Sequence, residues 1–399
     1  MSCIIANMSP SHSDPPAQSV SPTIAGSAPP DRRRPIITSL NGDNSWLLSF
    51  PYPTTATDSP APEAAPNPAD PSSNPRQKAY YHIAFDPWLN GPAKLITPLF
   101  GSFTQPHQVA ITSGAGVEDV ARQIETAALY STTIYPPSSS EDETKSGPSP
   151  IDAILLTFNA TDHMHEPTLR TFSPSIPVFC PDHVAAIVRG WGYFDTVIVT
   201  KDYDPAPITE SGDRDEDAWR SLRPGDDGED GGLPPWLSFF RVQGSFFLNL
   251  AFAVVYSSAS PSRGESHEAL LFVPHGIKVD APAIGGFLEE WGDARKDVRK
   301  SVLGLFHALH ESFTMGVAVT YGVVGGLALD RLARPRYWVK SHHALLVPGG
   351  VFPWLSWIKD VARTLTWGLE QEKKAEKGVS RSREPNVVEV ENGGCFVLE

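Results

Sequence analysis

The chain has 399 residues, of which 46 are Asp or Glu and 32 are Lys or Arg, so its formal net charge is −14 at pH 7. A nucleic-acid partner requires a basic face for phosphate contacts, and this charge balance argues against one. The 39 prolines and 31 glycines gather in segments without periodic apolar residues, which predicts one compact domain with long inserts.

The start of the chain predicts a disordered tail and no export signal. Residues 1–34 are rich in Ser and Pro, and they lack a positive segment followed by an apolar core. Two apolar stretches, 246–256 and 315–329, are too short to cross a bilayer. Three widely spaced cysteines without a CxxC motif fit a reducing compartment. We therefore expect a cytoplasmic protein with no membrane partner.

The predicted domain begins at about residue 35 with a hairpin. Two β-rich runs in 35–50 flank an Asn-Gly pair, which is a strong signal for a tight turn between strands. A low-complexity insert at about 54–78 separates this hairpin from a strand in 79–89. Apolar residues at helical spacing then predict a helix over 113–129.

Strands and helices alternate after a second insert at about 132–149. Strands are predicted at 151–158, 176–180 and 195–200, a helix is opened by Pro167, and another helix covers 181–191. This alternation is typical of an α/β layered domain.

The second half of the domain follows a third, acidic insert at about 202–235. Its carboxylates lack the spacing of an EF-hand, so we interpret it as a surface loop. The predicted domain ends at residue 369, and a charged, flexible tail is expected over 370–399. The predicted elements in between are strands at 245–256, 268–277 and 336–342 and helices at about 294–312 and 323–333.

A metal-type loop follows the predicted strand that ends at Phe158. Asp162, His163 and His165 come within seven residues of that strand end, and ligands bind at the carboxyl edges of strands in open α/β sheets. Carboxylate and imidazole groups suit zinc, iron or manganese. The alternative is a chance Asp-His pair, which occurs in many chains.

Five segments in this order resemble the metallo-β-lactamase superfamily, especially a fungal UlaG-like branch. The resemblance covers roughly residues 36–360 without the inserts. It implies an α/β (α+β) fold in which two packed mixed β-sheets, flanked by helices, form an αββα sandwich with one or two metal ions at the edge between the sheets. The segments are LNGDNSWLLSF, YYHIAFDPWLNGP, IDAILLTFNATDHMHEPTL, ALLFVPHGI and RYWVKSHHA.

The resemblance also implies that one of two metal sites is lost. The family's HxHxDH signature falls on 158–163, where Phe158 and Ala160 stand in place of two histidines. Neither side chain can donate a lone pair to a metal. A further family histidine is expected on the strand at 245–256, which contains none. The motif is therefore degenerate.

The resemblance implies that more of the second site is kept. Asp162 and His163 match the family's Asp-His pair, and His342 matches its final histidine. His275 stands where the family has a bridging Asp, and it is an optional fourth ligand. Asp86 matches an aspartate that supports the ligand loop by hydrogen bonds. Three protein ligands suffice for one catalytic ion if a position stays open.

Other polar groups have alternative interpretations. Asp162, His165 and His343 are the candidates for catalysis, the two histidines by proton transfer, whereas isolated histidines more often start helices or lie on surfaces. His307 and His310 are three apart in the predicted helix at about 294–312. Their apolar neighbours favour a packed helix face over a second ligand pair.

Three functional hypotheses stay open. The leading one is a divergent member of the superfamily with at most one metal ion, zinc or else iron or manganese, and weak or absent hydrolase activity, which would make it a pseudoenzyme. The second is an active metal-dependent hydrolase of an ester, amide or phosphoester in an unidentified small molecule. The third is an interaction scaffold that holds no metal. Neither the substrate nor the oligomeric state can be inferred from these residues.

Overall fold

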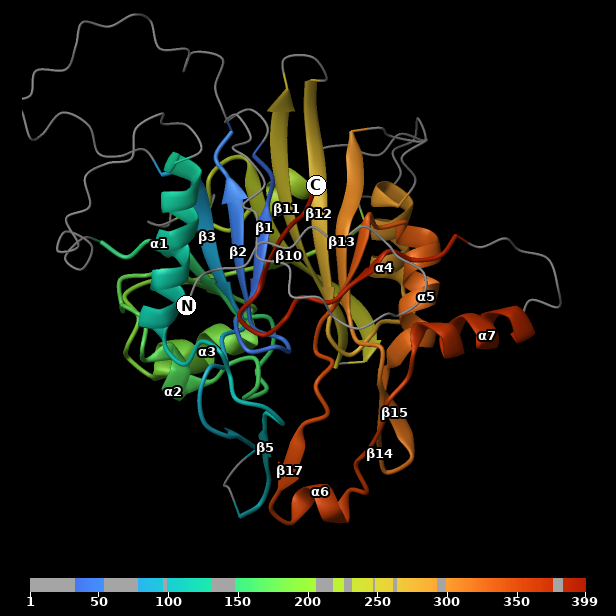
Figure 1. The fold of residues 1–399 in the computed structure, drawn as a ribbon. Coiled ribbons are helices and arrows are strands. Elements are labelled where there is room, and N and C mark those ends of the chain that lie inside the picture. Colours follow the sequence, from blue (N-terminus) through green and yellow to red (C-terminus); the bar gives the residue numbers. More distant parts are fainter. Residues whose placement is uncertain are drawn as a thin grey trace, which may run out of the picture.

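The computed structural model places two seven-stranded sheets face to face with helices on both outer sides (Figure 1). The predicted tail at 1–34 and the predicted inserts at 54–78 and 132–149 lie almost wholly outside the described residues. The described residues are 33–53, 78–95, 99–130, 148–205, 218–225, 232–246, 248–260, 264–292, 299–375 and 383–399.

The first sheet has the order β20-β1-β2-β3-β6-β7-β8. Its strands are β1 (Ile36–Ser39), β2 (Trp46–Pro51), β3 (Tyr80–Phe85), β6 (Ala153–Leu155), β7 (Val178–Cys180), β8 (Val197–Val199) and β20 (Cys395–Val397). The predicted hairpin is present as the antiparallel pair β1 and β2, and β3, β6, β7 and β8 are parallel to one another.

The second sheet has the order β19-β16-β13-β12-β11-β10-β9. Its strands are β9 (Lys201–Asp202), β10 (Leu237–Phe246), β11 (Asn249–Ser260), β12 (Gly264–Val273), β13 (Lys300–His307), β16 (Tyr337–Lys340) and β19 (Val387–Val388). The pairs β10 with β11 and β11 with β12 are antiparallel, whereas β12, β13 and β16 are parallel. Both sheets are therefore mixed.

Helices cover the two outer faces. In Figure 1, α1 and α3 lie beside the first sheet, and α4 and α5 lie beside the second. No helix among the described residues is both long and apolar enough to reach across a membrane. The helices are α1 (Gly114–Tyr130), α2 (Glu166–Leu169), α3 (Asp182–Gly190), α4 (Pro282–Trp291), α5 (Gly322–Ala333), α6 (Phe352–Leu355) and α7 (Leu365–Ala375), with a 3₁₀ helix at Ala218–Leu222.

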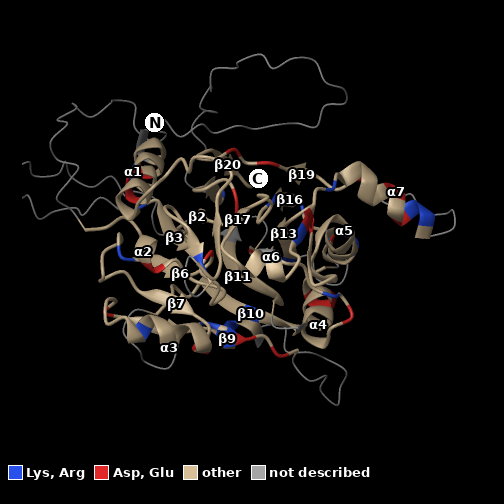
Figure 2. Cartoon of the chain, turned by 90° about the horizontal axis from the view of Figure 1, so that it is seen from below, with Lys and Arg blue, Asp and Glu red and all other residues tan. Residues whose placement is uncertain are grey.

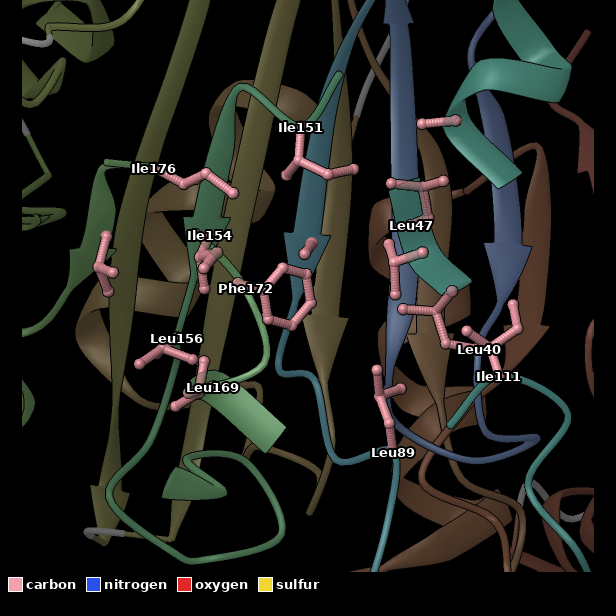
Figure 3. Packing of buried hydrophobic residues seen from close by; sticks show 14 of the residues in the cluster. Leu40, Leu47, Leu89, Ile111, Ile151, Ile154, Leu156, Leu169, Phe172 and Ile176 are labelled. Atoms are coloured by element: carbon pink, nitrogen blue, oxygen red, sulfur yellow. The ribbon is translucent and has the colours of Figure 1, made fainter. Parts of the chain in front are cut away.

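Alternation along the strands builds the layers, because successive side chains of a strand point to opposite faces. Leu48 and Leu155 pack between the sheets, whereas Leu47 and Ile154 pack outward under α1 and α3. Figure 3 shows the outward cluster, in which Phe172 lies in the same packed group. A third cluster fills the space between the second sheet and α4 and α5. The expected αββα sandwich is confirmed.

Two small sheets project from one end of the sandwich, at the bottom of Figure 1. One has the order β17-β5-β4 and the other β15-β14-β18, and α6 lies between them in the sequence. The bounds are β4 (Ala93–Lys94), β5 (Ser102–Thr104), β14 (Glu311–Thr314), β15 (Val317–Tyr321), β17 (Val347–Gly349) and β18 (Lys359–Val361).

The prediction of a helix at about 294–312 is wrong for residues 299–312, which the structure describes. Residues 300–307 form β13, which pairs with β12 and β16, and β14 follows. Val302 and Leu305 pack toward the helices while Leu303 and Phe306 pack between the sheets. A strand that is buried on both faces does not alternate between polar and apolar residues. Its apolar residues can then lie three positions apart, as they do on one face of a helix.

The segment 370–399 was expected to be a flexible tail, but parts of it form regular secondary structure. Residues 365–375 form α7, and the segment from 383 onward contributes β19 and β20 to the edges of the two large sheets. Phe396 and Leu398 are buried in the layer between the sheets, which explains the pairing. Within the acidic insert at 202–235, Trp219 is buried, while 206–217 and 226–231 lie outside the described residues.

Candidate metal centre

Three histidines from three different strand ends meet at one edge of the sandwich. His163 lies in the loop after β6, His275 lies two residues after β12, and His342 lies two residues after β16. One ring nitrogen from each can be chosen so that all three lie within 4.8 Å of one another. Among the described residues, this is the group of side chains with the spacing of metal ligands.

Three ring nitrogens of this group have no hydrogen-bond partner. Nε2 of His163 and both ring nitrogens of His342 are buried and unpaired. Buried polar atoms nearly always have a hydrogen-bond partner. Unpaired nitrogens in a group of converging rings are therefore consistent with a site for a bound cation. A divalent transition metal accepts such lone pairs, and imidazole is a ligand for zinc, iron and manganese centres. The residues therefore fit the metal that the fold resemblance implies.

A carboxylate stands beside the three rings. Oδ2 of Asp162 lies 3.4 Å from Nε2 of His342 and 3.6 Å from Nε2 of His163, an ion-pair distance without a well-directed hydrogen bond. Asn44 fixes the loop that carries this carboxylate, because its Nδ2 donates to the carbonyl oxygen of Asp162 at 2.7 Å. The structure thus brings together all four residues expected as ligands, Asp162 and the three histidines.

Asp86 orients His163 from behind. It follows β3 in a left-handed conformation with φ of 42°, and its Oδ2 accepts a hydrogen bond from Nδ1 of His163 at 2.7 Å. The same carboxylate accepts the backbone N–H and the hydroxyl of Thr157 at 2.8 and 2.5 Å. Because Nδ1 of His163 holds the proton, Nε2 presents its lone pair to the other rings.

His275 and His342 are held by partners that the sequence did not single out. Thr320 of β15 places its Oγ1 3.2 Å from Nδ1 of His275. His342 has φ of 49°, and its N–H donates to the carbonyl of Asp43 at 3.1 Å, while the Asp43 carboxylate accepts the N–H of Ala344 at 2.8 Å. Asp43 lies in the Asn-Gly segment, which was interpreted only as a turn.

The electrostatics of the centre favour a cation. Burial alone would lower the pKa of His163, but Asp162 and Asp86 outweigh it and raise that pKa to about 9. Burial also opposes the charge on His342, yet Asp162 and Asp43 raise its pKa. Against its own burial, the pKa of Asp162 is held well below its usual range by His163 and His342. A field that draws protons to imidazoles also stabilises a divalent ion, which competes for the same lone pairs.

His275 differs from the other two rings. Burial, together with His342 and His163, lowers its pKa well below the usual value. It is therefore neutral across the physiological range, which is the form that binds metals. His275 stands where the family resemblance expects a bridging Asp, so it adds no negative charge to the centre.

The two histidines expected to transfer protons lie apart from the cluster. Nδ1 of His165 is 2.9 Å from the hydroxyl of Thr168, and its ring packs against Trp88 with ring centroids 6.5 Å apart. Nδ1 of His343 accepts the N–H of Leu309 at 3.3 Å. Neither belongs to the group of three converging rings.

Two buried phenylalanines lie close to His163. Phe158 is buried and presents its ring edge-on to His163, with the centroids 6.0 Å apart. Phe252, on the strand where a further histidine was expected, is buried between the sheets and lines a small cavity beside His163 together with Asp86. The space beside His163 is therefore lined in part by aromatic side chains.

A larger pocket adjoins the metal loop. It has a volume of about 620 Å³ and lies between α2, α3 and the segment around β4. Thr161 and His165 of the metal loop line one side, and Lys94, Glu166 and Trp191 line others. Thr161 ties the two sides together, because its hydroxyl donates to the carbonyl of Lys94 at 2.8 Å. The pocket has the size and mixed polarity of a small-molecule site.

Comparison with known proteins gives structural matches only. No protein-family model matches the sequence, and no curated protein matches it significantly. Similar solved structures include an isothiocyanate hydrolase from Delia radicum gut bacteria, with a TM-score of 0.42, 12% identity, and coverage of 91% of this chain and 100% of that one. The metallo hydrolase Igni18 from Ignicoccus hospitalis has a TM-score of 0.36, 12% identity and coverage of 92% and 98%.

A third similar structure is the metallo-β-lactamase-fold protein YhfI from Bacillus subtilis. Its TM-score is 0.38 and its identity 10%, with 91% of this chain and 99% of that chain covered. These scores and identities are low, so we assign the fold from the strand order and packing of this chain itself.

Proposed function

We propose that the protein is a metal-dependent hydrolase that works with a single ion, held by His163, His275 and His342. The observation that carries this proposal is the convergence of three ring nitrogens within 4.8 Å at a sheet edge, with those of His163 and His342 buried and unpaired. Three protein ligands with an open position are typical of catalytic rather than structural zinc sites. Phe158 and Ala160 leave no second pair of ligands, which supports one ion and not two.

Such an ion supplies Lewis acidity and makes water a nucleophile at neutral pH. The chain's own residues supply the rest. Asp162, whose Oδ2 lies 3.4 Å from Nε2 of His342, is in place to accept the proton from water. Asp86 holds His163 in the tautomer that leaves Nε2 free.

The pocket beside the metal loop supports binding of a small molecule next to the centre. Lys94, at its rim, provides positive charge, and Trp191 provides an apolar wall. The reaction class that fits is hydrolysis of an ester, amide or phosphoester, since each needs an activated water and stabilisation of developing negative charge.

Metal analysis tests the proposal. Protein purified without chelators should contain about one zinc, iron or manganese ion per chain, and a His163→Ala variant should lose it. His183→Ala, at an exposed position of α3, is the matched control and should keep the metal. Hydrolysis of a panel of model esters, amides and phosphoesters should stop with a chelator and return with the ion.

The variant Asp162→Asn distinguishes between two roles of this carboxylate, acceptance of a proton and ligation of the ion. We expect it to retain the ion and to lose turnover, because an amide cannot accept the proton. Loss of the ion from this variant would make Asp162 a ligand instead. A wild-type protein that stays free of metal after soaking would overturn the hydrolase and leave the scaffold hypothesis, and a loaded protein without turnover would be a pseudoenzyme.

A further inference from the structure

The projecting end of the molecule is unusually apolar on its surface. Thirteen large apolar side chains are exposed among the described residues, and three of them, Ile187, Val324 and Leu332, lie on helices of the sandwich. The other ten form what we call the apolar tip. The apolar tip consists of Leu95, Leu99, Phe100, Met315, Val317, Leu345, Val347, Val351, Leu355 and Trp357.

The three segments that carry the apolar tip are joined to one another. The N–H of Phe352 at the start of α6 donates to the carbonyl of Phe100 at 2.7 Å, and the two rings stack with centroids 5.2 Å apart. At the other end of α6, the N–H of Met315 donates to the carbonyl of Ser356 at 2.8 Å. Helix α6 therefore joins the two small sheets.

The apolar tip surrounds the end at which the candidate metal centre lies. Thr320 of β15 contacts His275, and Thr161 of the metal loop donates to the carbonyl of Lys94 in β4. The third segment begins directly after His342. Each of the three projecting segments is thus anchored to a residue of the centre or its loop.

Charge distinguishes this end from the rest of the chain. Residues 93–105, 315–321 and 344–359 contain no Asp or Glu, although the whole chain has 46. Their two charged residues are Lys94 and Lys359, both exposed. Figure 2 looks onto this end, where α6 and β17 show neither red nor blue. Asp360, which follows Lys359 in β18, is also exposed, whereas Glu311 of β14 is paired with Arg363 at 2.7 Å. These segments together with β18 therefore carry two exposed cations and one exposed carboxylate, in a protein with a net charge of −14.

We propose that the apolar tip docks the protein on the surface of an anionic lipid membrane. Exposed Leu and Trp side chains insert at the boundary between headgroups and acyl chains, and neighbouring lysines contact anionic headgroups. Trp357, which is 78% exposed, lies two residues from Lys359 and offers this combination. Docking at the surface needs no spanning helix, so the absence of apolar stretches long enough to cross a bilayer does not argue against it.

Charge favours a lipid surface over a second copy of the chain. In a twofold dimer the same patch would face itself, which brings two lysines of each copy together with one exposed carboxylate, Asp360, to pair them. Anionic headgroups supply the missing negative charge. This proposal concerns the surface alone and does not depend on the metal or on hydrolysis.

Co-sedimentation with vesicles tests the docking. The full chain is mixed with vesicles of phosphatidylcholine alone or with phosphatidylserine, and the bound fraction is measured at low and at physiological salt. We expect binding to the anionic vesicles, weakened by salt. The double variant Leu355→Ser/Trp357→Ser should lower the partition coefficient by more than about tenfold, and Lys359→Gln by about fivefold.

Matched controls remove the same groups elsewhere. Leu332→Ser removes an exposed leucine of α5, and Lys374→Gln removes an exposed lysine of α7, so neither should change binding. Leu99 is 79% exposed in the turn before β5, and Leu99→Ser should weaken binding on its own. This variant serves as the test if thermal unfolding shows that the double variant is misfolded.

Two outcomes would overturn the proposal. One is that the wild-type chain does not bind anionic vesicles, or binds them as well after Leu99→Ser as before. The other is a dimer, detected by light scattering, that the Leu355→Ser/Trp357→Ser variant abolishes, which would assign the apolar tip to self-association.

Discussion

Nδ1 of His163 donates to Oδ2 of Asp86 across 2.7 Å, and each of the two side chains is only 1% exposed. The pair connects β3 with the loop after β6, so the ring that faces the centre is fixed by a neighbouring strand. A carboxylate in this position sets the tautomer of a ligand and raises its basicity.

Asp86→Asn should weaken metal binding without unfolding the protein. Loss of such a supporting carboxylate typically lowers metal affinity by roughly ten- to a hundredfold. Zinc affinity measured by competition with a chromogenic chelator checks this. Asp152→Asn, which changes a half-buried carboxylate paired with Lys78, is the control and should leave the affinity unchanged. Equal affinities in wild type and Asp86→Asn would mean that His163 is not a ligand.

His275→Ala should lower the affinity for zinc by more than about tenfold, because it removes a ligand and not merely a support. Thr320→Val removes only the hydroxyl that lies 3.2 Å from Nδ1 of His275, so its effect should be smaller. The same competition assay compares the two variants. If His275→Ala binds zinc as the wild type does, the ion is held by the remaining two histidines and Asp162.

Acid should destabilise the fold through a buried histidine outside the centre. Burial lowers the pKa of His307 to about 4, whereas an unfolded chain has a histidine pKa near 6.5. Between about pH 4 and 6.5, His307 is protonated in the unfolded chain but neutral in the folded protein. The free energy of unfolding is therefore unaffected by His307 above about pH 6.5. As the pH falls below this value, protonation of His307 in the unfolded chain lowers the free energy of unfolding by up to about 3 kcal/mol.

Urea unfolding of chelator-treated protein at several pH values measures this effect. The His307→Gln variant cannot titrate, so its free energy of unfolding should depend less steeply on pH between about 4 and 6.5. Parallel curves for variant and wild type would assign the acid sensitivity to other groups, such as His310, whose pKa burial also lowers.

The aromatic stack behind the centre should dominate the stability of the sandwich. The ring of Phe272 stacks on Phe85 of the opposite sheet, with centroids 4.0 Å apart, and on Phe306 at 4.1 Å. Phe272→Ala should cost about 3–5 kcal/mol of unfolding free energy in urea titrations. Leu99→Ala, on the surface, should stay within about 0.5 kcal/mol. A cost below about 1 kcal/mol for Phe272→Ala would show that the sheets repack around the gap.

Local patterns in the sequence predict an α/β layered domain. Leu47 and Leu48 pack on opposite faces of β2, and helical spacing marks α1, whereas the αββα arrangement was implied only by the family resemblance. The strand β13 could not be predicted, because Val302 and Phe306 belong to layers on opposite faces and no polar residue marks either. Its neighbours in space, β12 and β16, decide its conformation.

The candidate centre was predictable where ligand types are distinctive. His163 and Asp162 stand out because they follow a buried strand directly, and His275 and His342 could be added only through the ordered resemblance. Asp43 carried no such signal, since an Asp within an Asn-Gly segment is common in turns. Its contact with His342 joins residues about three hundred positions apart, which no local pattern encodes.

The strand order also has a consequence for synthesis. β20 pairs with one side of β1, the first strand among the described residues, so the hydrogen-bonding groups on that side stay unpaired until residue 397 has been translated. A nascent chain with such an open edge is prone to pair with other polypeptides. We therefore expect that this protein depends on holdase chaperones while it is being made, and that yield in recombinant expression improves when translation is fast relative to aggregation.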